Sequence, residues 1–426
     1  AWIAQRNTLI SGLFGLLALY FHDRARRDEG RGRDAIFASM SLGAALFSAE
    51  AGLGIVPYLL VHAWVYDRSR WRRALMPYGP PLVLWLLCYK LGAYGTHSSG
   101  VYIDPLDAPL SFSANVMRNA PLLIATELGM PGADLYPFLP LYAKTLLIAF
   151  AVGVVSLFLA VFQAHLRRDS NARFLVCGAL LAILPTCATI PGSRLTFLTS
   201  FGLLGGLAQL VAAWRDGESW FPSNGWARRR ALPLVYWSGL GHVFLSPLAF
   251  VFMMHQMTIF ESVVVRLANG LPEDPRLESQ RLIVVNAPEP AFCAYVMLIR
   301  DDEGRSTPNR MLAMSNGARD LAMTRLDATT VQLTSQIGLV QPGADLLARG
   351  ERPFKIGDRV DLSDLSIEVT RVNADGWPIE AKFMFKKPIE NEGLRWMQWK
   401  DQTLAPMDLP KVGESLSFPG QVIQLF

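Results

Sequence analysis

Charged residues are scarce in this sequence. Asp, Glu, Lys and Arg make up 18% of the 426 residues and hydrophobic residues make up 51%, whereas soluble domains average about 25% charged residues. The shortage is concentrated in the first 255 residues or so, and this half of the chain is therefore expected to lie in a membrane. The net charge of +4 is small, and the arginines fall in short loops between apolar segments, which argues against a nucleic-acid partner.

Cysteine and histidine are also sparse, which excludes several kinds of site. The four cysteines form no CxxC pair, so a disulfide framework is not expected. The six histidines show no HxxxH or HExxH spacing, so no metal site is predicted from them. The second half of the chain contains no phosphate-binding loop and no nucleophile elbow.

The first half of the chain contains a series of apolar segments. A membrane-spanning helix needs about 20 apolar residues, with a range of roughly 17–25. We predict a membrane all-α domain over 1–257 with about eight spans, although the second and third segments are short and could form one kinked span. The segments are 8–22, 35–49, 51–66, 76–95, 141–166, 174–190, 194–214 and 232–255.

The loops between these segments alternate between arginine-rich and arginine-poor. The arginine-rich loops are 23–34, 67–73, 167–173 and 215–230. The positive-inside rule places these loops in the cytoplasm. Eight crossings then put the start of the chain and everything after residue 257 outside the cytoplasm.

The long arginine-poor loop at 96–140 lies on the predicted outer side. Its portion 106–138 is not apolar enough to cross a membrane. It could form a helix that lies on the membrane surface, or a folded external loop with a small apolar core of its own.

Residues beyond 257 have the composition of a soluble protein. We assign 258–278 to a linker and 279–426 to a soluble, mostly-β (α+β) domain, a sandwich or small barrel. A helix is predicted at 291–300 and a hairpin at 321–334. Further strands are predicted at 281–285, 311–314, 359–362, 366–372, 379–385 and 415–418.

Charged groups at the edge of a bilayer are costly, so each is a candidate for function. Glu50 lies at a predicted external turn and could hold a substrate hydroxyl, pair with a basic residue or bind a divalent cation as a cofactor. It could equally be a helix-end carboxylate in water. Arg194 follows Pro191-Gly192-Ser193, and its guanidinium matches the geometry of a lipid phosphate. The alternative is an arginine that extends to the headgroups.

Three further residues on the predicted outer side could bind substrate. Arg6, with its polar neighbours Gln5 and Asn7, could line a cavity or mark the interface. Tyr102 and Asp104 lie in the external loop. Because Asp-Pro is a common turn pair, a structural role is the stronger interpretation of Asp104.

Three stretches resemble, in this order, motifs of the bacterial membrane glycosyltransferases of the GT-C superfamily, which are related to protein O-mannosyltransferases. The first ten residues resemble the family's "AWIAGR-D-LL" run, Ser48-Ala49-Glu50 resembles "SKE", and 193–202 resembles "ER-LYLPS-G". The resemblance covers roughly residues 1–215. Ala49 stands in place of the family's lysine and Ser193 in place of its glutamate, and the second half carries no TPR repeats.

This resemblance implies a GT-C-like fold in a bacterial inner membrane, with the β-rich domain in the periplasm. The implied reaction transfers a sugar from a polyprenyl-phosphate donor to an unknown acceptor of the cell envelope. A carboxylate would act as general base and a cationic group would stabilise the departing phosphate. We expect the base upstream of Ala1, Arg194 at the phosphate and Glu50 in a positioning role. The alternative is a non-catalytic membrane protein that displays its β-rich domain for binding, which the two lost charges favour.

The charge alternation gives a direct test of topology. We predict that a cysteine introduced within 300–306 reacts with a membrane-impermeant thiol reagent on intact cells, in a chain whose four native cysteines have been replaced. Labelling that occurs only after lysis would contradict the external placement of the β-rich domain.

Overall fold

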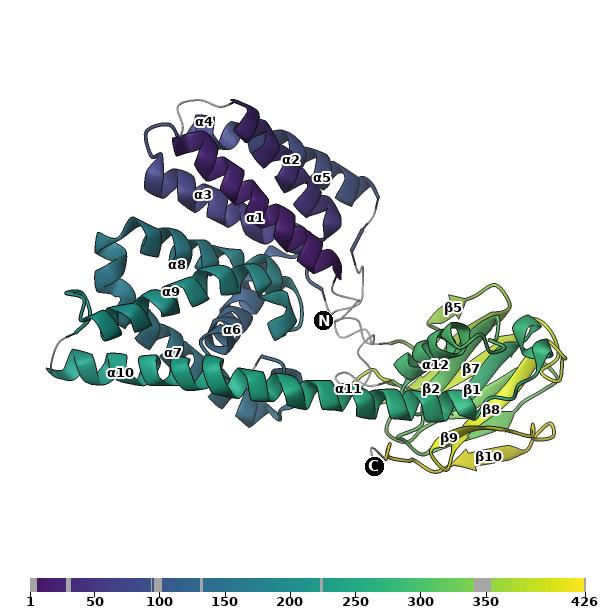
Figure 1. Cartoon of the computed structure of the whole chain (residues 1–426). Coiled ribbons are helices and arrows are strands. Elements are labelled where there is room, and N and C mark those ends of the chain that lie inside the picture. Colours follow the sequence, from purple (N-terminus) through teal and green to yellow (C-terminus); the bar gives the residue numbers. More distant parts are fainter. Residues whose placement is uncertain are drawn as a thin grey trace. The chain divides into compact units, whose positions relative to one another are not determined.

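The computed structural model describes residues 6–27, 32–92, 94–95, 102–130, 133–222, 225–340 and 354–424. The chain divides into two compact units, Ala1–Leu248 and Ala249–Phe426, named unit 1 and unit 2 here. Unit 1 is helical, whereas unit 2 contains the strands (Figure 1). The boundary between them falls inside helix α11, Ser246–Asn269.

Each of the eight predicted apolar segments coincides largely with helix. The segments 35–49 and 51–66 form two separate helices, joined by the 3-10 helix η2, Glu50–Gly54. In chain order the helices before residue 100 are α1 Arg6–Arg27, α2 Gly32–Ser48, η2, α3 Ile55–Tyr66, α4 Trp71–Leu75, η3 Met76–Tyr78 and α5 Gly79–Leu91. Those that follow are α6 Pro109–Glu127, η4 Tyr136–Phe138, α7 Leu141–Arg168, α8 Ser170–Ala182, η5 Pro185–Ala188, η6 Ser193–Leu195, α9 Phe197–Asp216, α10 Gly225–Gly239, the π-helical turn η7 Leu240–Leu245, and α11.

Four helices in the described part of the chain are long and apolar enough to cross a membrane, rather than the eight predicted. They are Leu141–Arg168, Ser170–Ala188, Phe197–Asp216 and Ala227–Asn269. The helices α2, α3 and α5 are too short, with 17, 12 and 13 residues, and α1 ends in three arginines that lower its hydropathy. The four spans indicate that the protein associates with a membrane.

The arginine-rich and arginine-poor loops of unit 1 lie at different ends of its helices. The arginine-rich loops contact one another: Arg26 pairs with Asp67, and the Tyr66 hydroxyl donates to Asn171 Oδ1 at 2.6 Å. We call this the arginine-rich end. The external loops predicted from the sequence meet elsewhere: Ile103 N donates to Ala188 O at 2.8 Å, and Ser193 N donates to Asp134 Oδ1 at 3.1 Å. We call this the arginine-poor end.

Helix α6 occupies most of the segment 106–138. Its residues Asn119 and Leu123 are fully buried, and Asn119 Nδ2 donates to Thr189 O at 2.9 Å. The segment therefore packs against the other helices of unit 1 through both apolar and polar contacts.

The close contact of α9 with α3 and α8 depends on Gly202. The buried hydroxyl of Tyr58 in α3 accepts from Gly202 N at 3.1 Å and donates to Leu198 O at 2.8 Å, so it enters the hydrogen-bond ladder of α9. A Cβ at position 202 would lie 2.1 Å from Leu175 O and 2.6 Å from the Tyr58 oxygen. Only glycine permits this approach, because every other residue carries a Cβ.

Unit 2 contains two sheets and the helix α12, Pro290–Asp302. The four-stranded sheet has the order β2-β1-β8-β9, with β1 parallel to both neighbours, and the six-stranded antiparallel sheet has the order β10-β3-β4-β7-β6-β5. The strands are β1 Arg281–Ala287, β2 Arg310–Asn316, β3 Leu321–Arg325, β4 Thr330–Thr334, β5 Arg359–Asp361, β6 Leu365–Val372, β7 Pro378–Phe385, β8 Leu394–Lys400, β9 Thr403–Pro406 and β10 Ser415–Phe418.

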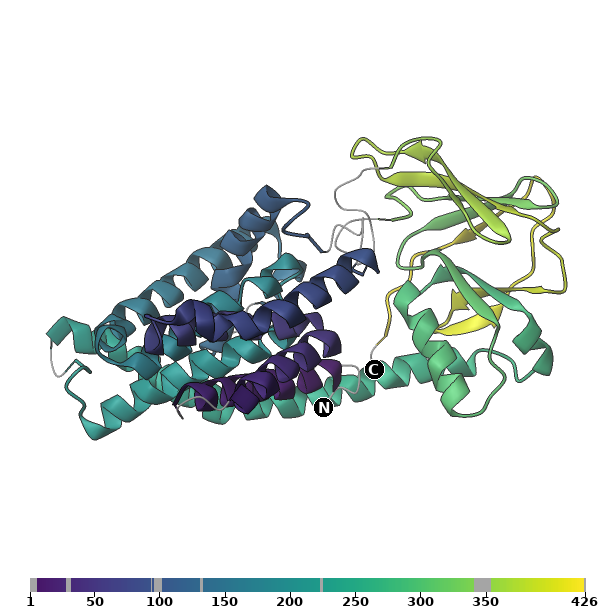
Figure 2. The same ribbon diagram turned by 90° about the horizontal axis from the view of Figure 1, so that it is seen from above.

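One hydrophobic core joins the two sheets. It combines Ile283 and Trp396 of the first sheet with Val331 and Phe383 of the second, so the two sheets of the predicted β-rich domain stack as a sandwich (Figure 2). The helices α11 and α12 pack against the first sheet through a separate core. Two of its strands, β8 and β9, were not predicted. The segment 258–278, assigned to a linker, holds the last turns of α11 and part of the 3-10 helix η8, Pro275–Ser279.

The Gly202 contact gives a test of the fold of unit 1. We predict that Gly202→Ala lowers the free energy of unfolding of the detergent-solubilised protein by about 1–3 kcal/mol, because the new methyl group clashes with the α8 backbone. The matched control is Gly153→Ala in α7, where a Cβ meets nothing within 4 Å among the described residues. A thermal-unfolding measurement in which both variants behave alike would contradict the packing.

Candidate functional site

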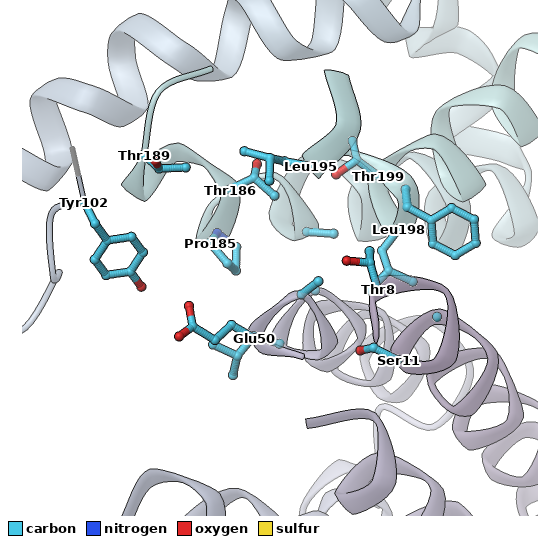
Figure 3. A pocket seen from close by; sticks show the side chains of 16 residues that line it. Thr8, Ser11, Glu50, Tyr102, Pro185, Thr186, Thr189, Leu195, Leu198 and Thr199 are labelled. Atoms are coloured by element: carbon cyan, nitrogen blue, oxygen red, sulfur yellow. The ribbon is translucent and has the colours of Figure 1, made fainter. Parts of the chain in front are cut away.

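A cavity of about 130 Å³ lies at the arginine-poor end of unit 1 (Figure 3). Its walls come from four parts of the chain: the start of α1, the η2 turn, Tyr102, and the stretch from the end of α8 to the start of α9. The residues that line it are Thr8, Ser11, Gly12, Glu50, Ala51, Leu53, Gly54, Tyr102, Ala182, Pro185, Thr186, Thr189, Leu195, Phe197, Leu198 and Thr199.

Small residues allow these segments to meet. A Cβ on Gly12 would lie 2.3 Å from Phe197, so glycine lets α1 approach the start of α9. A Cβ on Gly52 would lie 2.7 Å from Ala45 O, and Ser11 Oγ donates to the same carbonyl at 2.9 Å. The η2 turn is thus held against α1, and this fixes the position of Glu50 at the cavity.

Glu50 and Tyr102 face each other across the cavity. Figure 3 shows the Glu50 carboxylate and the Tyr102 hydroxyl pointing toward one another. Tyr89 of α5 is placed to hydrogen-bond with both groups. Burial, together with the neighbouring Glu50 carboxylate, raises the pKa of Tyr102. The phenol therefore keeps its proton at neutral pH and can act as a hydrogen-bond donor.

The cavity is otherwise apolar, with hydroxyl groups spaced along its wall. Thr8 and Ser11 come from α1, and Thr186, Thr189 and Thr199 from the opposite side (Figure 3). Hydroxyls both donate and accept hydrogen bonds, so this lining suits an uncharged ligand with several hydroxyl groups.

Asp104 is held by structural contacts outside the cavity lining. Lys90 Nζ donates to Asp104 Oδ2 at 2.7 Å, and Leu106 N donates to Oδ1 at 2.8 Å, as in a common turn. Partial burial alone would raise the pKa of Asp104. The hydrogen-bond donors outweigh it and hold this pKa below its usual range. These contacts satisfy the Asp104 carboxylate, which therefore needs no ligand.

The two candidate arginines lie beside the cavity rather than in its lining. Arg194 is exposed in η6 and directly precedes the lining residue Leu195. Arg6, also exposed, is the first residue of α1, two positions before Thr8. The cavity therefore brings Glu50 and Tyr102 together but does not include Arg6, Asp104 or Arg194.

Sequence reasoning missed Glu127, the last residue of α6. Its carboxylate accepts hydrogen bonds from Thr196 and from Ser200 Oγ, the latter at 2.5 Å. Burial raises the pKa of Glu127, although the two hydroxyl donors act in the opposite direction. A carboxylate within the apolar run 121–130 was a visible signal, whereas single threonines in helices give none.

The described residues offer little support for a metal at Glu50. No three His, Cys, Asp or Glu side chains in the described ranges are grouped so that they could hold a metal ion. A divalent cation there would need most of its oxygen ligands from a substrate or from water.

A second polar cluster lies at the arginine-rich end. Tyr78 Oη lies 2.8 Å from His22 Nδ1, and His62 Nε2 lies 3.2 Å from Asp23 Oδ1. The two histidine rings meet edge to face with centroids 4.6 Å apart. These contacts join α1, α3 and η3, so we assign these residues to the packing of the helices.

Comparison with known proteins does not place the chain in a family. No protein-family model matches the chain, and neither the search of curated proteins nor the search of solved structures gives a match. The resemblance to membrane glycosyltransferases therefore stays a prediction.

The raised pKa of Glu127 gives a pH test. A carboxyl with a higher pKa in the folded state binds its proton more tightly when folded, so its contribution to stability is lost as the pH rises through the folded pKa. Glu127→Gln cannot titrate. We therefore predict that the melting temperature of this variant minus that of the wild type increases from pH 5 to pH 8.

The matched control is Glu218→Gln, which changes an exposed carboxyl of unit 1. Its melting temperature, compared with the wild type over the same pH range, gives the reference for an exposed carboxyl. A melting-temperature difference for Glu127→Gln that varies with pH no more than this reference would contradict the burial of Glu127.

Proposed function

We propose that this chain is an integral membrane glycosyltransferase-like protein. It transfers a sugar from a polyprenyl-phosphate donor to an acceptor in the cell envelope, at the extracytoplasmic face of a bacterial inner membrane. The observation that carries the proposal is the cavity in which Glu50 faces Tyr102 among five aliphatic hydroxyl side chains.

The roles follow from the chemistry of the lining. Glu50 accepts a hydrogen bond from a sugar or acceptor hydroxyl and orients it, and Tyr102 donates to a neighbouring oxygen. Arg194 has no ion-pair partner among the described residues and is available to hold the donor phosphate beside Leu195.

The size of the cavity limits what it holds. Its volume of about 130 Å³ is below the roughly 300–1,000 Å³ of typical ligand pockets. In this proposal it takes only the reacting end of the sugar, and the polyprenyl chain lies outside, on the exposed apolar side chains of the helices. Tyr142, Leu146 and Phe150 share one face of α7 and form such a surface, with exposed fractions of 72%, 67% and 52%.

The orientation of the protein in the membrane belongs to the same proposal, and the positive-inside rule determines it. The arginine-rich end would then face the cytoplasm, and unit 2 the periplasm.

A non-catalytic membrane protein is the second candidate. The observations that favour it are the small cavity, the position of Arg194 outside its lining, and the replacement of two charged motif residues by Ala49 and Ser193. In that case unit 1 would serve to anchor unit 2 in the membrane, and unit 2 would bind an envelope component.

A donor-turnover assay separates the two candidates. The full-length protein, reconstituted in proteoliposomes with an envelope extract as acceptor, is supplied with polyprenyl-phosphate hexose labelled in the sugar. We predict that Glu50→Gln lowers the release of polyprenyl phosphate by about 10²-fold, because an uncharged amide accepts the hydroxyl's hydrogen bond more weakly than a carboxylate and orients that hydroxyl less well.

The control is Asp107→Asn, a change of another exposed carboxylate at the same end but outside the cavity lining. It should keep the wild-type rate. Equal rates for the wild type and Glu50→Gln would show that Glu50 has no role in the reaction. No turnover of the donor by the wild type would favour the non-catalytic candidate.

A further inference from the structure

Unit 2 contains a basic groove that the proposed function does not use. It has a volume of about 430 Å³ and lies beside the starts of β1, β2 and β8, near the end of β7 (labelled in Figure 1). The residues that line it are Ser279, Arg281, Asn309, Arg310, Ser363, Asp364, Phe385, Lys386, Lys387, Asn391, Gly393 and Leu394.

Positive charge is in excess in this groove. Four of the lining residues are cations, Arg281, Arg310, Lys386 and Lys387, whereas Asp364 is the one carboxylate in the lining. Arg281 and Arg310 lie directly opposite each other on the parallel strands β1 and β2. Like charges in such a pair repel, so the fold keeps an arrangement that an added anion would stabilise.

The arginines are held in place by neighbouring contacts. The Arg281 side chain is 12% exposed and pairs with Asp364, while its Nε is buried with no hydrogen-bond partner among the described residues. Arg310 Nη1 donates to Ser363 Oγ at 3.2 Å. Lys386 N donates to Asp364 O at 3.0 Å, which fixes the backbone that carries both lysines. The cations are therefore positioned around the groove before any ligand arrives.

The groove continues into a second hollow, whose lining combines neutral polar groups with two arginines and three carboxylates. This hollow, of about 820 Å³, shares Ser279, Asn391, Gly393 and Leu394 with the first. Gln280 lines it, donates through Nε2 to Glu392 O at 2.7 Å, and has a buried Oε1 without a partner among the described residues. Amide and hydroxyl groups of this kind hydrogen-bond sugar hydroxyls.

We propose that this groove binds an anionic saccharide, a sugar that carries a phosphate or carboxylate group. The anion lies among Arg281, Arg310 and the two lysines, and the sugar ring extends toward Asn391 and Gln280. The inference concerns unit 2 alone and holds whether or not the Glu50 cavity transfers sugar.

Calorimetric titration of the full-length protein in detergent tests the proposal. The probes are glucose 6-phosphate, glucuronate, glucose and inorganic phosphate. We expect both anionic sugars to bind at least about tenfold more tightly than glucose. The double variant Lys386→Gln/Lys387→Gln should weaken the binding of the anionic sugars about tenfold. Arg310→Gln should also weaken it. Higher salt should weaken binding by the wild type.

The matched control is Lys400→Gln/Lys411→Gln, which removes the same charge from two exposed lysines outside the groove. It should bind the anionic sugars as the wild type does. Equal binding of glucose and the anionic sugars, or an equal loss in the control, would overturn the proposal. Inorganic phosphate that binds as tightly as glucose 6-phosphate would overturn recognition of the sugar.

Discussion

The cost of placing charged or unpaired polar groups in an apolar medium determines how unit 1 is arranged. Its arginine-rich loops meet at one end, where Arg26 pairs with Asp67 and Tyr66 contacts Asn171. Between the ends, the buried Tyr58 hydroxyl has both a donor and an acceptor in α9. The cavity then forms at the other end, where Glu50 and Tyr102 lie outside the apolar middle and keep their polar partners.

The cavity depends on close contacts between segments far apart in the sequence. Gly12 and Gly52 let α1, η2 and the start of α9 meet, and Gly202 brings α9 against α8 and Tyr58. Any bulkier residue at these points would separate the walls that carry Glu50 and the threonines. The proposed chemistry therefore rests on packing positions as much as on the polar groups.

Much of the fold could be predicted, because periodicity and composition are local signals. The eight apolar segments, the helix at 291–300 and the hairpin at 321–334 all appear in the structure. The number of candidate spans was overestimated, since short apolar runs such as α3 satisfy the composition of a span but not its length. Strand β8 was missed because Arg395 and Lys400 interrupt its tryptophan-rich pattern, although Trp396 and Trp399 are buried as core residues. The pairing of Arg281 with Arg310 depends on strand register, which a single sequence does not reveal.

The central claim is that the arginine-poor end holds a polyprenyl-phosphate sugar. Photo-crosslinking tests it most directly, with p-benzoylphenylalanine in place of Thr189 at the cavity or of the exposed Trp71 at the arginine-rich end. Irradiation of the full-length protein in proteoliposomes with labelled polyprenyl-phosphate hexose should attach the label at position 189 and not at position 71. Equal labelling at both positions, or labelling at position 71 alone, would contradict the account.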